Sequence, residues 1–487
     1  MGGRALPAGA FPPDGELRRT SGLDTGEKLW YDMTAYHDGW GRDPADFLRA
    51  VAGTVEKRMI DEILFPAAEG VAEMSDVRTF GAAGNGSADD TAAVQRAIDA
   101  GGITRFPAGT YRCGTLYLRD FTTLELEPGA VLLASPDRGD YNPDDFAPAN
   151  HVYPTEAVSG AHLLIADGCC NITIRGGGRI DGNRSAFYEL PADLVCSYET
   201  ITWRPGQMLF LRRCRNVTIT DVELTNSPYW NCFLYGCEEV RIHGVRIVNP
   251  MATPNGDGLD LDSCRRVTVS DCIIETGDDC IAIRASADHG IAEPVCENIT
   301  ITNCVLTTVC NAVRIGVGTG TIRRILMNNC SIVGSRTGIC MAIQYWTGAS
   351  LQIEECIFSQ LFIEAERPFS IHSNAWGRTA GKVSRQIRGI TFSQIRGTVS
   401  VGNLIDAYEP GDIRDLCFDR IALRWTGKAP GTVWEEPGYD FTERTDHAPQ
   451  AVWCIRNGER IELRNCTVCR EKGAEEIPEE LLRISDE

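Results

Sequence analysis

Apolar and polar residues alternate with a period of two through a short phrase that recurs along much of the chain. The phrase reads CRNVTITDVELTNS from Cys214, CEEVRIHGVRIVNP from Cys237 and CRRVTVSDCIIETG from Cys264. Another copy begins at Cys296, and degenerate copies continue from Ile322. Successive copies start 23, 27, 32 and 26 residues apart. This spacing indicates one turn of a solenoid per copy.

Each copy predicts short strands joined by bends, because its alternation breaks at a small or polar residue and then resumes. Such a unit cannot bury its apolar side alone, but stacked copies form a continuous core. The pattern therefore predicts an all-β fold, a parallel β-helix over residues 74–470. Helical periodicity is nearly absent there, which disfavours a horseshoe or an α-solenoid.

The twenty cysteines of the chain fit this solenoid. Cys264 and Cys272 lie eight residues apart, as do Cys296 and Cys304. Equivalent side chains stack in columns along a solenoid, so we expect interior thiols that replace Ile or Val. The alternative is a metal cluster, but CTVC (466–469) is a lone pair without a second half. We predict no metal site and no cofactor.

Three parts follow along the chain: an N-terminal extension (1–73), the β-helix (74–470) and an acidic C-terminal tail (471–487), solvated or a short helix. A capping segment at 74–135 reads as strand, turn, helix and strands. Its helix should be capped by Asp89 or Asp90 and end at Gly101. Its apolar stripe comprises Ala93, Val94, Ala97 and Ile98.

Charge and composition exclude several classes of partner. The 487 residues carry a net charge of -20, which argues against nucleic acid and against an anionic membrane surface. The charge also disfavours long polyanionic substrates unless the cleft is locally positive. We find neither a secretory signal nor an apolar run long enough to span a membrane, and therefore expect a soluble cytoplasmic protein. A homo-oligomer is possible.

Acidic residues gather where strands of two neighbouring copies begin. In NGDGLDLDSC, Asp257 stands at the bend before a strand, and in GDDC, Asp278 and Asp279 occupy the equivalent bend one coil later. Because adjacent coils lie roughly 4.8 Å apart, the three carboxylates should meet in one patch. Like charges that close raise one another's pKa, so one carboxyl can stay protonated while its neighbours ionise.

An acid for the leaving oxygen and a base for the attacking water are what hydrolysis of a glycosidic bond requires. The alternative is that acids at bends cap turns or face solvent. We prefer that interpretation for four other acids of the stretch: Asp260, Asp262, Asp271 and Glu275. It is less suited to the trio, because paired Asp beside Gly is unfavourable in a strand.

The chain resembles glycoside hydrolase family 28, the polygalacturonase family of right-handed parallel β-helices, from about residue 75 to 470. The similar motifs are NSPYWN (226–231), NGDGLDLDSC and GDDC, in the same order and one coil apart. The resemblance implies a right-handed coil and hydrolysis with inversion, without metal. It also implies that Asp278 is the general acid and that Asp257 and Asp279 position and activate the water.

Two positions depart from the family pattern. Cys310 and Asn311 stand where the family has its His, and Gln344 stands in the coil of the Arg-Ile-Lys that holds the sugar carboxylate. Parity places Arg284 and Arg314 on the outer face, where we hypothesise a relocated site for an anion or hydroxyl. The alternative is that both arginines only pair with neighbouring acids.

Aromatic side chains on the same face could stack on sugar rings. Trp230 lies in the NSPYW motif, Tyr235 follows it, and Trp346 shares the outward parity of Gln344. Single surface aromatics are also common. The predicted substrate-binding set comprises Arg284, Arg314, Trp230, Gln344, Trp346 and Asn255.

These features predict an inverting glycosidase that cleaves short oligosaccharides, derived from pectin or related polymers. Two alternatives stay open. A β-helix lyase would use clustered Asp to bind calcium and an Arg as base. A non-catalytic carbohydrate-binding β-helix would have lost the family's His and Lys along with its activity.

Overall fold

A computed structural model describes residues 74–143, 159–188, 203–287, 291, 293–343, 350–373, 385–427, 451–473 and 480–485. The predicted N-terminal extension (1–73) lies outside these residues. So do two members of the predicted substrate-binding set, Gln344 and Trp346.

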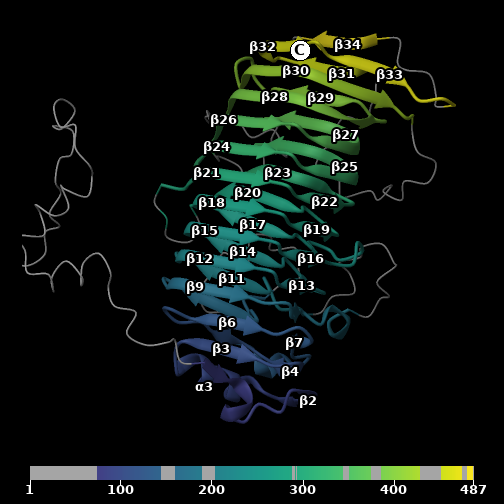
Figure 1. Ribbon diagram of the computed structural model, residues 1–487. Coiled ribbons are helices and arrows are strands. Elements are labelled where there is room, and N and C mark those ends of the chain that lie inside the picture. Colours follow the sequence, from purple (N-terminus) through teal and green to yellow (C-terminus); the bar gives the residue numbers. More distant parts are fainter. Residues whose placement is uncertain are drawn as a thin grey trace, which may run out of the picture. The chain divides into compact units, whose positions relative to one another are not determined.

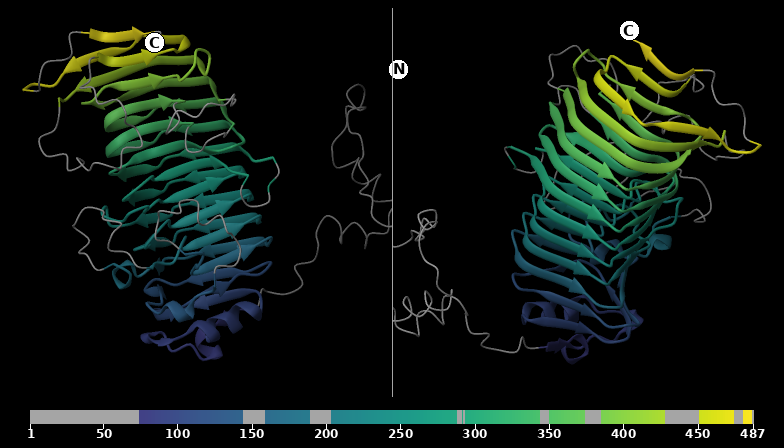
Figure 2. Two further views of the ribbon diagram at one scale, coloured as in Figure 1. Left: turned by 180° about the vertical axis from the view of Figure 1, so that it is seen from behind. Right: turned by 45° about the horizontal axis from the view of Figure 1, so that its top comes forward.

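The described strands stack into a parallel β-helix, which confirms the predicted fold (Figure 1). Each complete coil contributes one strand to each of three sheets, and the strand pairings among the described residues are all parallel, as between β17 and β20. Figure 2 shows the coils stacked along one axis from two further directions. In the later coils, two successive strands merge into one long bent strand, such as β28 (Arg385–Val399).

We name the sheets by their order within a coil. Sheet 1 contains β5 (Leu116–Tyr117), β8 (Leu164–Asp167), β11 (Leu209–Arg212), β14 (Cys232–Tyr235), β17 (Leu259–Asp262), β20 (Ile281–Ala285), β23 (Asn311–Gly318), the last parts of β25 (Ser331–Ala342) and β27 (Phe362–His372), β29 (Asn403–Asp406), β31 (Ala451–Arg456) and β34 (Glu480–Ser485).

Sheet 2 contains β1 (Met74–Asp76), β3 (Ile103–Phe106), β6 (Thr123–Leu126), β9 (Cys170–Arg175), β12 (Arg215–Thr220), β15 (Glu238–His243), β18 (Arg265–Ser270), β21 (Val295–Thr302), β24 (Thr321–Asn328), β26 (Leu351–Ser359), the first parts of β28 and β30 (Ile413–Trp425), and β32 (Glu459–Arg464).

Sheet 3 contains β2 (Asn85–Asp89), β4 (Gly109–Cys113), β7 (Ala130–Ala134), β10 (Arg179–Asp181), β13 (Glu223–Thr225), β16 (Arg246–Val248), β19 (Ile273–Thr276), β22 (Val305–Thr308), the first parts of β25 and β27, the last parts of β28 and β30, and β33 (Thr467–Arg470).

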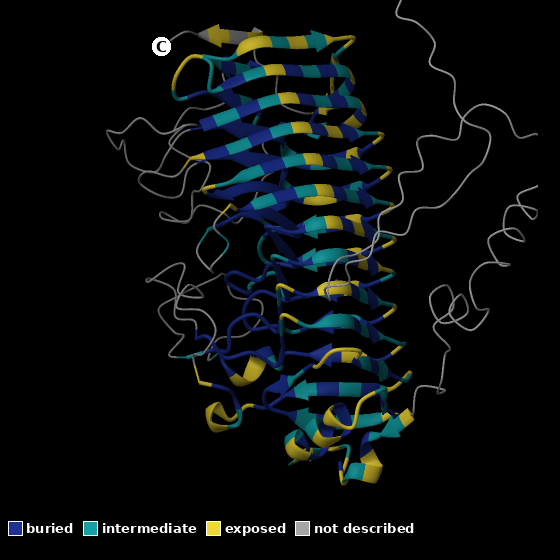
Figure 3. Ribbon diagram, turned by 90° about the vertical axis from the view of Figure 1, so that its left-hand side faces the viewer, coloured by how far each residue is buried: buried dark blue, intermediate teal, exposed yellow. Residues whose placement is uncertain are grey.

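The sheets differ in how their outer faces are covered. In sheet 2, buried and accessible residues alternate along strands such as β18, because only one face packs on the core (Figure 3). In sheet 1, β14, β17, β20 and β23 are buried at every position. The outer face of sheet 1 is therefore also removed from solvent, and polar side chains there need partners.

The bends between sheets 2 and 3 place single residues in the left-handed backbone region. Asp271, Asn303 and Asn329 have φ values of 57°, 57° and 50°. Asn and Asp tolerate this conformation better than most residues, which explains their recurrence in the repeat. The stacked amides also bond each other: Asn329 Nδ2 donates to Asn303 Oδ1 at 2.8 Å.

The expectation of interior cysteine columns is confirmed. Cys264, Cys272, Cys296 and Cys304 are 0–1% exposed and lie in the main hydrophobic core. No cysteine of the described residues forms a disulfide. Burial raises the pKa of the Cys296 thiol, as expected for an inert core side chain.

The capping segment contains the predicted helix, α3 (Thr91–Asp99), at the N-terminal end of the described coils (Figure 1). Its buried residues are the predicted stripe, Ala93, Val94, Ala97 and Ile98. Asp89 Oδ1 accepts a hydrogen bond from the Thr91 amide at 3.0 Å. Asp90 does not cap the helix; its carboxylate accepts from the amides of Ala83 and Gly84. Short 3₁₀ turns among the described residues are Val77–Phe80, Arg138–Asp140 and Arg184–Ala186.

At the C-terminal end, the structure differs from the predicted tail or short helix. Glu480–Ser485 form strand β34, which pairs with β31 in parallel. The exposed row of amides and carbonyls on β31 provides the template for this added strand.

Within the described chain, we find no helix that meets the length and hydropathy needed to cross a membrane.

An aromatic stack fills the core of the later coils. The rings of Phe358 and Phe392 are stacked with centroids 5.1 Å apart, and those of Phe392 and Phe418 are 4.7 Å apart. Phe369 meets Phe392 edge to face at 5.0 Å. Stacked coils thus align identical side chains, and each ring buries a large apolar area.

Replacing the central ring tests this core. We expect Phe392→Ala to lower the free energy of unfolding by about 3–5 kcal/mol, because it removes a fully buried ring and leaves a cavity. The matched control is Phe121→Ala, because Phe121 is 68% exposed. Urea unfolding followed by intrinsic fluorescence measures both variants. Equal losses from the two substitutions would contradict the assigned core.

Candidate functional site

Two bends that lead from sheet 3 into sheet 1 lie side by side. One bend ends at Gly258, before β17, and carries Asp257; the other spans 277–280, before β20. The Gly258 amide donates to the Asp279 carbonyl at 2.9 Å, which links the bends directly. A Cβ at Gly258 would lie 2.5 Å from the Cys280 carbonyl oxygen, so this close approach requires glycine.

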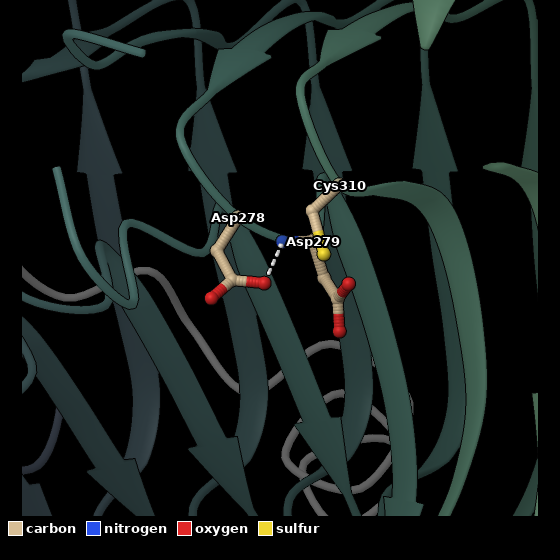
Figure 4. Close-up of side chains that lie close together, drawn as sticks. All are labelled: Asp278, Asp279 and Cys310. Atoms are coloured by element: carbon tan, nitrogen blue, oxygen red, sulfur yellow. Dashed lines mark hydrogen bonds between the residues drawn. The ribbon is translucent and has the colours of Figure 1, made fainter. Parts of the chain in front are cut away.

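Asp278 is the most accessible member of the acidic trio, being half-buried, whereas Asp257 and Asp279 are 2% and 1% exposed. Its Oδ1 accepts a hydrogen bond from the Asp279 amide at 3.0 Å (Figure 4). Burial, followed by repulsion from Asp279, raises the pKa of Asp278 to about 6. Asp278 is therefore the trio carboxyl best placed to give a proton to a bound ligand.

Asp279 is held by two side chains from the next coil. Asn311 Nδ2 donates to Asp279 Oδ1 at 2.8 Å, and Arg314 Nη1 lies 3.7 Å from Asp279 Oδ2. Asn311 thus has a specific role at a position where the sequence suggested only a missing His. Its neighbour Cys310 places its thiol beside Asp278 and Asp279, as Figure 4 shows.

Asp257 completes the trio from the preceding coil. Burial, followed by the charges of Asp260, Asp278 and Asp279, raises the pKa of Asp257 well above its ordinary value. Arg284 opposes this effect, with Nη2 3.4 Å from Asp257 Oδ2. The structure therefore brings Asp257, Asp278 and Asp279 into one electrostatically coupled cluster.

Asp260 corrects the sequence interpretation, which placed both Asp260 and Asp262 in solvent or at turns. Both lie under the covered outer face of sheet 1, and Asp260 is fully buried. Arg284 Nη2 lies 2.9 Å from Asp260 Oδ1, yet burial still raises the pKa of Asp260 to about 8. Asp262 does act at a turn, because its Oδ1 accepts from the amide of Ser286 at 2.8 Å.

The two arginines of the proposed anion site pair with acids, as the alternative interpretation expected. Arg284 contacts Asp257 and Asp260, and Arg314 contacts Asp279. Their side chains are only 6% and 9% exposed. Substrate binding by either arginine stays a prediction, whereas contact with the acidic cluster is observed.

Trp230 and Tyr235 are buried, not exposed on the surface as the sequence suggested. The guanidinium carbon of Arg284 lies 4.2 Å from the centre of the Trp230 ring, which is 3% exposed. This cation–π contact adds to the ion pairs that hold the arginine in place. Tyr235 is fully buried and donates its hydroxyl to the Ser286 carbonyl at 3.0 Å.

Arg204 was missed by sequence reasoning, although it connects both motifs. Its guanidinium is fully buried and donates to the carbonyls of Pro228 and Pro254 at 3.0 and 2.7 Å. It also donates to Asn255 Oδ1 at 2.8 Å, so Asn255 serves this network. Arg204 lies in TWRPG, outside every repeat copy, so no sequence pattern linked it to the site.

His372 was also missed, because it follows Asp279 by 93 residues. It lies on sheet 1, paired in register with Ala342 of the preceding coil. Burial, followed by the charges of Arg314 and Arg367, lowers the pKa of His372 to about 3. A neutral imidazole therefore stands on the same sheet as Arg314 and within reach of its charge. The stacking of later coils was the only signal in the sequence that could have found it.

Asp278, Asp279 and Cys310 offer three ligand atoms within 4.8 Å of one another. The residues are a poor fit for a cation. Burial raises the pKa of the Cys310 thiol well above its ordinary value, and thiolate is the form that binds metal. Arg314 also lies 3.7 Å from Asp279 Oδ2. We derive no metal-dependent step from this group.

The chain matches the family described as "Glycosyl hydrolases family 28" over residues 150–411. It is 29% identical over 247 residues to a probable polygalacturonase of Vitis vinifera, covering 48% of this chain and 49% of that protein. It is 22% identical over 285 residues to polygalacturonase QRT2 of Arabidopsis thaliana, covering 56% and 59%. The chain thus spans about half the length of these curated relatives.

Solved structures show the same fold. A family 28 exopolygalacturonase of Yersinia enterocolitica aligns with a TM-score of 0.65 at 19% identity, covering 85% of this chain and 78% of that chain. A hyperthermoactive exopolygalacturonase of Thermotoga maritima aligns with a TM-score of 0.61 at 20% identity, covering 72% and 87%.

The buried pair of Arg284 and Asp260 gives a test of the site's electrostatics. We expect Arg284→Met to lower the free energy of unfolding by on the order of 3 kcal/mol, because Asp260 loses its only ion-pair partner among the described residues. Adding Asp260→Asn should recover more than half of the loss, since the uncompensated carboxylate is then gone.

Chemical denaturation at pH 8 measures the free energy of unfolding of Arg284→Met, of the double variant and of a control. The matched control is Arg215→Met, whose ion pair with Glu239 lies at the surface, and we expect no comparable loss there. If Asp260→Asn did not rescue Arg284→Met, the pairing would not explain the burial of the arginine.

Proposed function

Because the chain belongs to glycosyl hydrolases family 28, we propose that it hydrolyses a glycosidic bond in a pectin-type carbohydrate, by an inverting acid/base reaction. The observation that carries this proposal is the pair of bends that unites Asp257, Asp278 and Asp279. Within the trio, one carboxyl is accessible and has a pKa near 6, while two are buried beside cations.

In the proposed reaction, Asp278 protonates the oxygen of the leaving sugar as the glycosidic bond breaks. A water attacks the anomeric carbon from the opposite face of the ring, and Asp279 accepts its proton. Asp257 positions that water, because its raised pKa leaves the carboxyl able to donate a hydrogen bond. Arg314 and Asn311 hold Asp279 in place through the contacts described above.

We propose a uronic-acid oligosaccharide as the substrate. The curated relatives are named polygalacturonases. The site also contains the guanidinium groups of Arg284 and Arg314, which could hold a sugar carboxylate as well as an aspartate. The net charge of -20 favours short chains over a long polyanion. A cytoplasmic location and a homo-oligomer stay predictions from the sequence.

Removing the acid tests the reaction. We expect Asp278→Asn to lower kcat at least a hundredfold on an oligogalacturonide while the Kd for the substrate changes less than about threefold, because proton donation is lost and the shape is kept. Reducing-sugar assay and calorimetry measure the two quantities. The control is Asp271→Asn, since Asp271 is an exposed acid of the same stretch.

Two outcomes would contradict hydrolysis. Products that absorb in the ultraviolet, with activity abolished by a chelator, would establish a lyase. A wild-type protein that binds oligosaccharides but cleaves none of a broad panel would establish a binding protein.

The pKa of Asp278 also predicts a pH profile. The acid works only when protonated, so kcat/KM should fall as pH rises through about 6. Initial rates from pH 4 to pH 8, at substrate concentrations far below KM, measure this fall in kcat/KM. A kcat/KM that stays constant up to pH 8 would remove Asp278 from the role of acid.

A further inference from the structure

A groove of about 660 Å³ crosses the outside of the later coils. It follows sheet 3 and the adjoining bend with sheet 2. Along the sheet, one column of paired residues forms its length: Ser331, Phe362, Arg396 and Ala422. The remaining lining residues are Asn329, Cys330, Gln360, Leu361, Gln394, Arg420 and Asn465.

Side-chain size explains the hollow. Small residues, Ser331 and Ala422, stand on either side of the large pair Phe362 and Arg396 in the column. The Phe362 ring is 44% exposed although it lies in a strand. An exposed aromatic ring beside a concavity is typical of binding surfaces and unusual for a strand that only builds the scaffold.

Some polar side chains of the groove have partners, because Asn329, Arg420 and Asn465 bond neighbouring side chains, but others do not. Arg396 is exposed, and no acidic group in the described part of the chain lies within ion-pairing distance of it. The side chains of Gln360 and Gln394, in the left-handed bend positions, make no hydrogen bond among the described residues. In the preceding coils, by contrast, Asn303 and Asn329 at the same bend bond each other.

Charge in the groove is opposite to that of the whole chain. Its lining contains two arginines and no acid, whereas the chain has a net charge of -20. Arg420 is held by Asp419, with Nε 2.9 Å from Oδ2, so Arg396 is the cation left for a ligand. A locally cationic groove attracts an anion that the rest of the surface repels.

We propose that this groove is a second, non-catalytic binding site for a uronic-acid oligosaccharide, the same class as the proposed substrate, on which the inference therefore rests. Phe362 packs against the apolar face of one sugar ring. Arg396 binds the carboxylate through its planar guanidinium, which matches two oxygens. The amides of Gln360 and Gln394 exchange hydrogen bonds with hydroxyl groups.

The groove is separate from the acidic trio. Asp278 follows β19, whereas Phe362 begins β27, and the pairing order β19, β22, β25, β27 places Phe362 three coils further along the axis. Three coils correspond to roughly 14 Å along the axis. The groove also lies on sheet 3, while the trio stands where sheet 1 begins. A ligand in the groove therefore keeps anionic sugar near the protein without occupying the proposed catalytic site.

Titration calorimetry with saturated trigalacturonic acid tests the proposal. The full chain carrying Asp278→Asn is used so that no turnover occurs. We expect two equivalents of ligand to bind this parent. Adding Phe362→Ala and Arg396→Gln should leave one equivalent, with the affinity of the lost site reduced at least tenfold. A neutral trisaccharide of galactose should not bind at the groove.

The matched control adds Phe121→Ala and Arg246→Gln to the same parent. Phe121 is exposed, and Arg246 is an exposed arginine of sheet 3 outside the groove. The control should still bind two equivalents. Thermal midpoints of both variants check that each has folded.

Several results would overturn the proposal: unchanged stoichiometry in the groove variant, equal binding of the neutral trisaccharide, or a change in sedimentation mass that shows the groove to be an interface between copies. Failure of the proposed function is distinguishable. An inactive wild-type protein that still loses one equivalent in the groove variant would refute hydrolysis and support the groove.

Discussion

Burial of several carboxylates against two guanidinium groups is the constraint on which the site depends. Asp257, Asp260 and Asp279 are almost completely buried, and Arg284 and Arg314 are their ion-pair partners. More acids than cations share this volume, so the cluster retains protons at pH values where free aspartates are ionised. The β-helix imposes this crowding, because every residue added to a column lies one strand spacing from the last.

The fold could be predicted in detail because the spacing within each repeat copy shows how the strands of neighbouring coils align. Alternation predicted the strands, and the eight-residue spacing of Cys264 and Cys272 predicted the interior columns. The C-terminal strand β34 was not predicted, since its sequence, ELLRIS, lacks the phrase and it forms by pairing with an available edge. The local pattern of apolar and polar residues does not reveal a strand that is added to the edge of a sheet.

The site was only partly predictable from the sequence. Equivalent bends of neighbouring coils predicted the cluster of Asp257, Asp278 and Asp279. Parity placed Arg284 and Arg314 on the outer face beside it, and the structure brings these residues together. Parity could not show that this face is covered, so Asp260 and Trp230 were assigned to the wrong environment. Arg204 and His372 reach the region of the site through tertiary contacts alone, and the sequence offers no periodic signal for either residue.

The central claim is that crowding keeps one accessible carboxyl protonated near neutral pH. Carbon-13 NMR of protein labelled at the aspartate carboxyl carbons measures this directly. We predict one resonance that titrates near pH 6 and is absent from the spectrum of Asp278→Asn. If the Asp278 resonance titrated near pH 4, like a free aspartate, the crowded bends would not supply an acid and the account would be wrong.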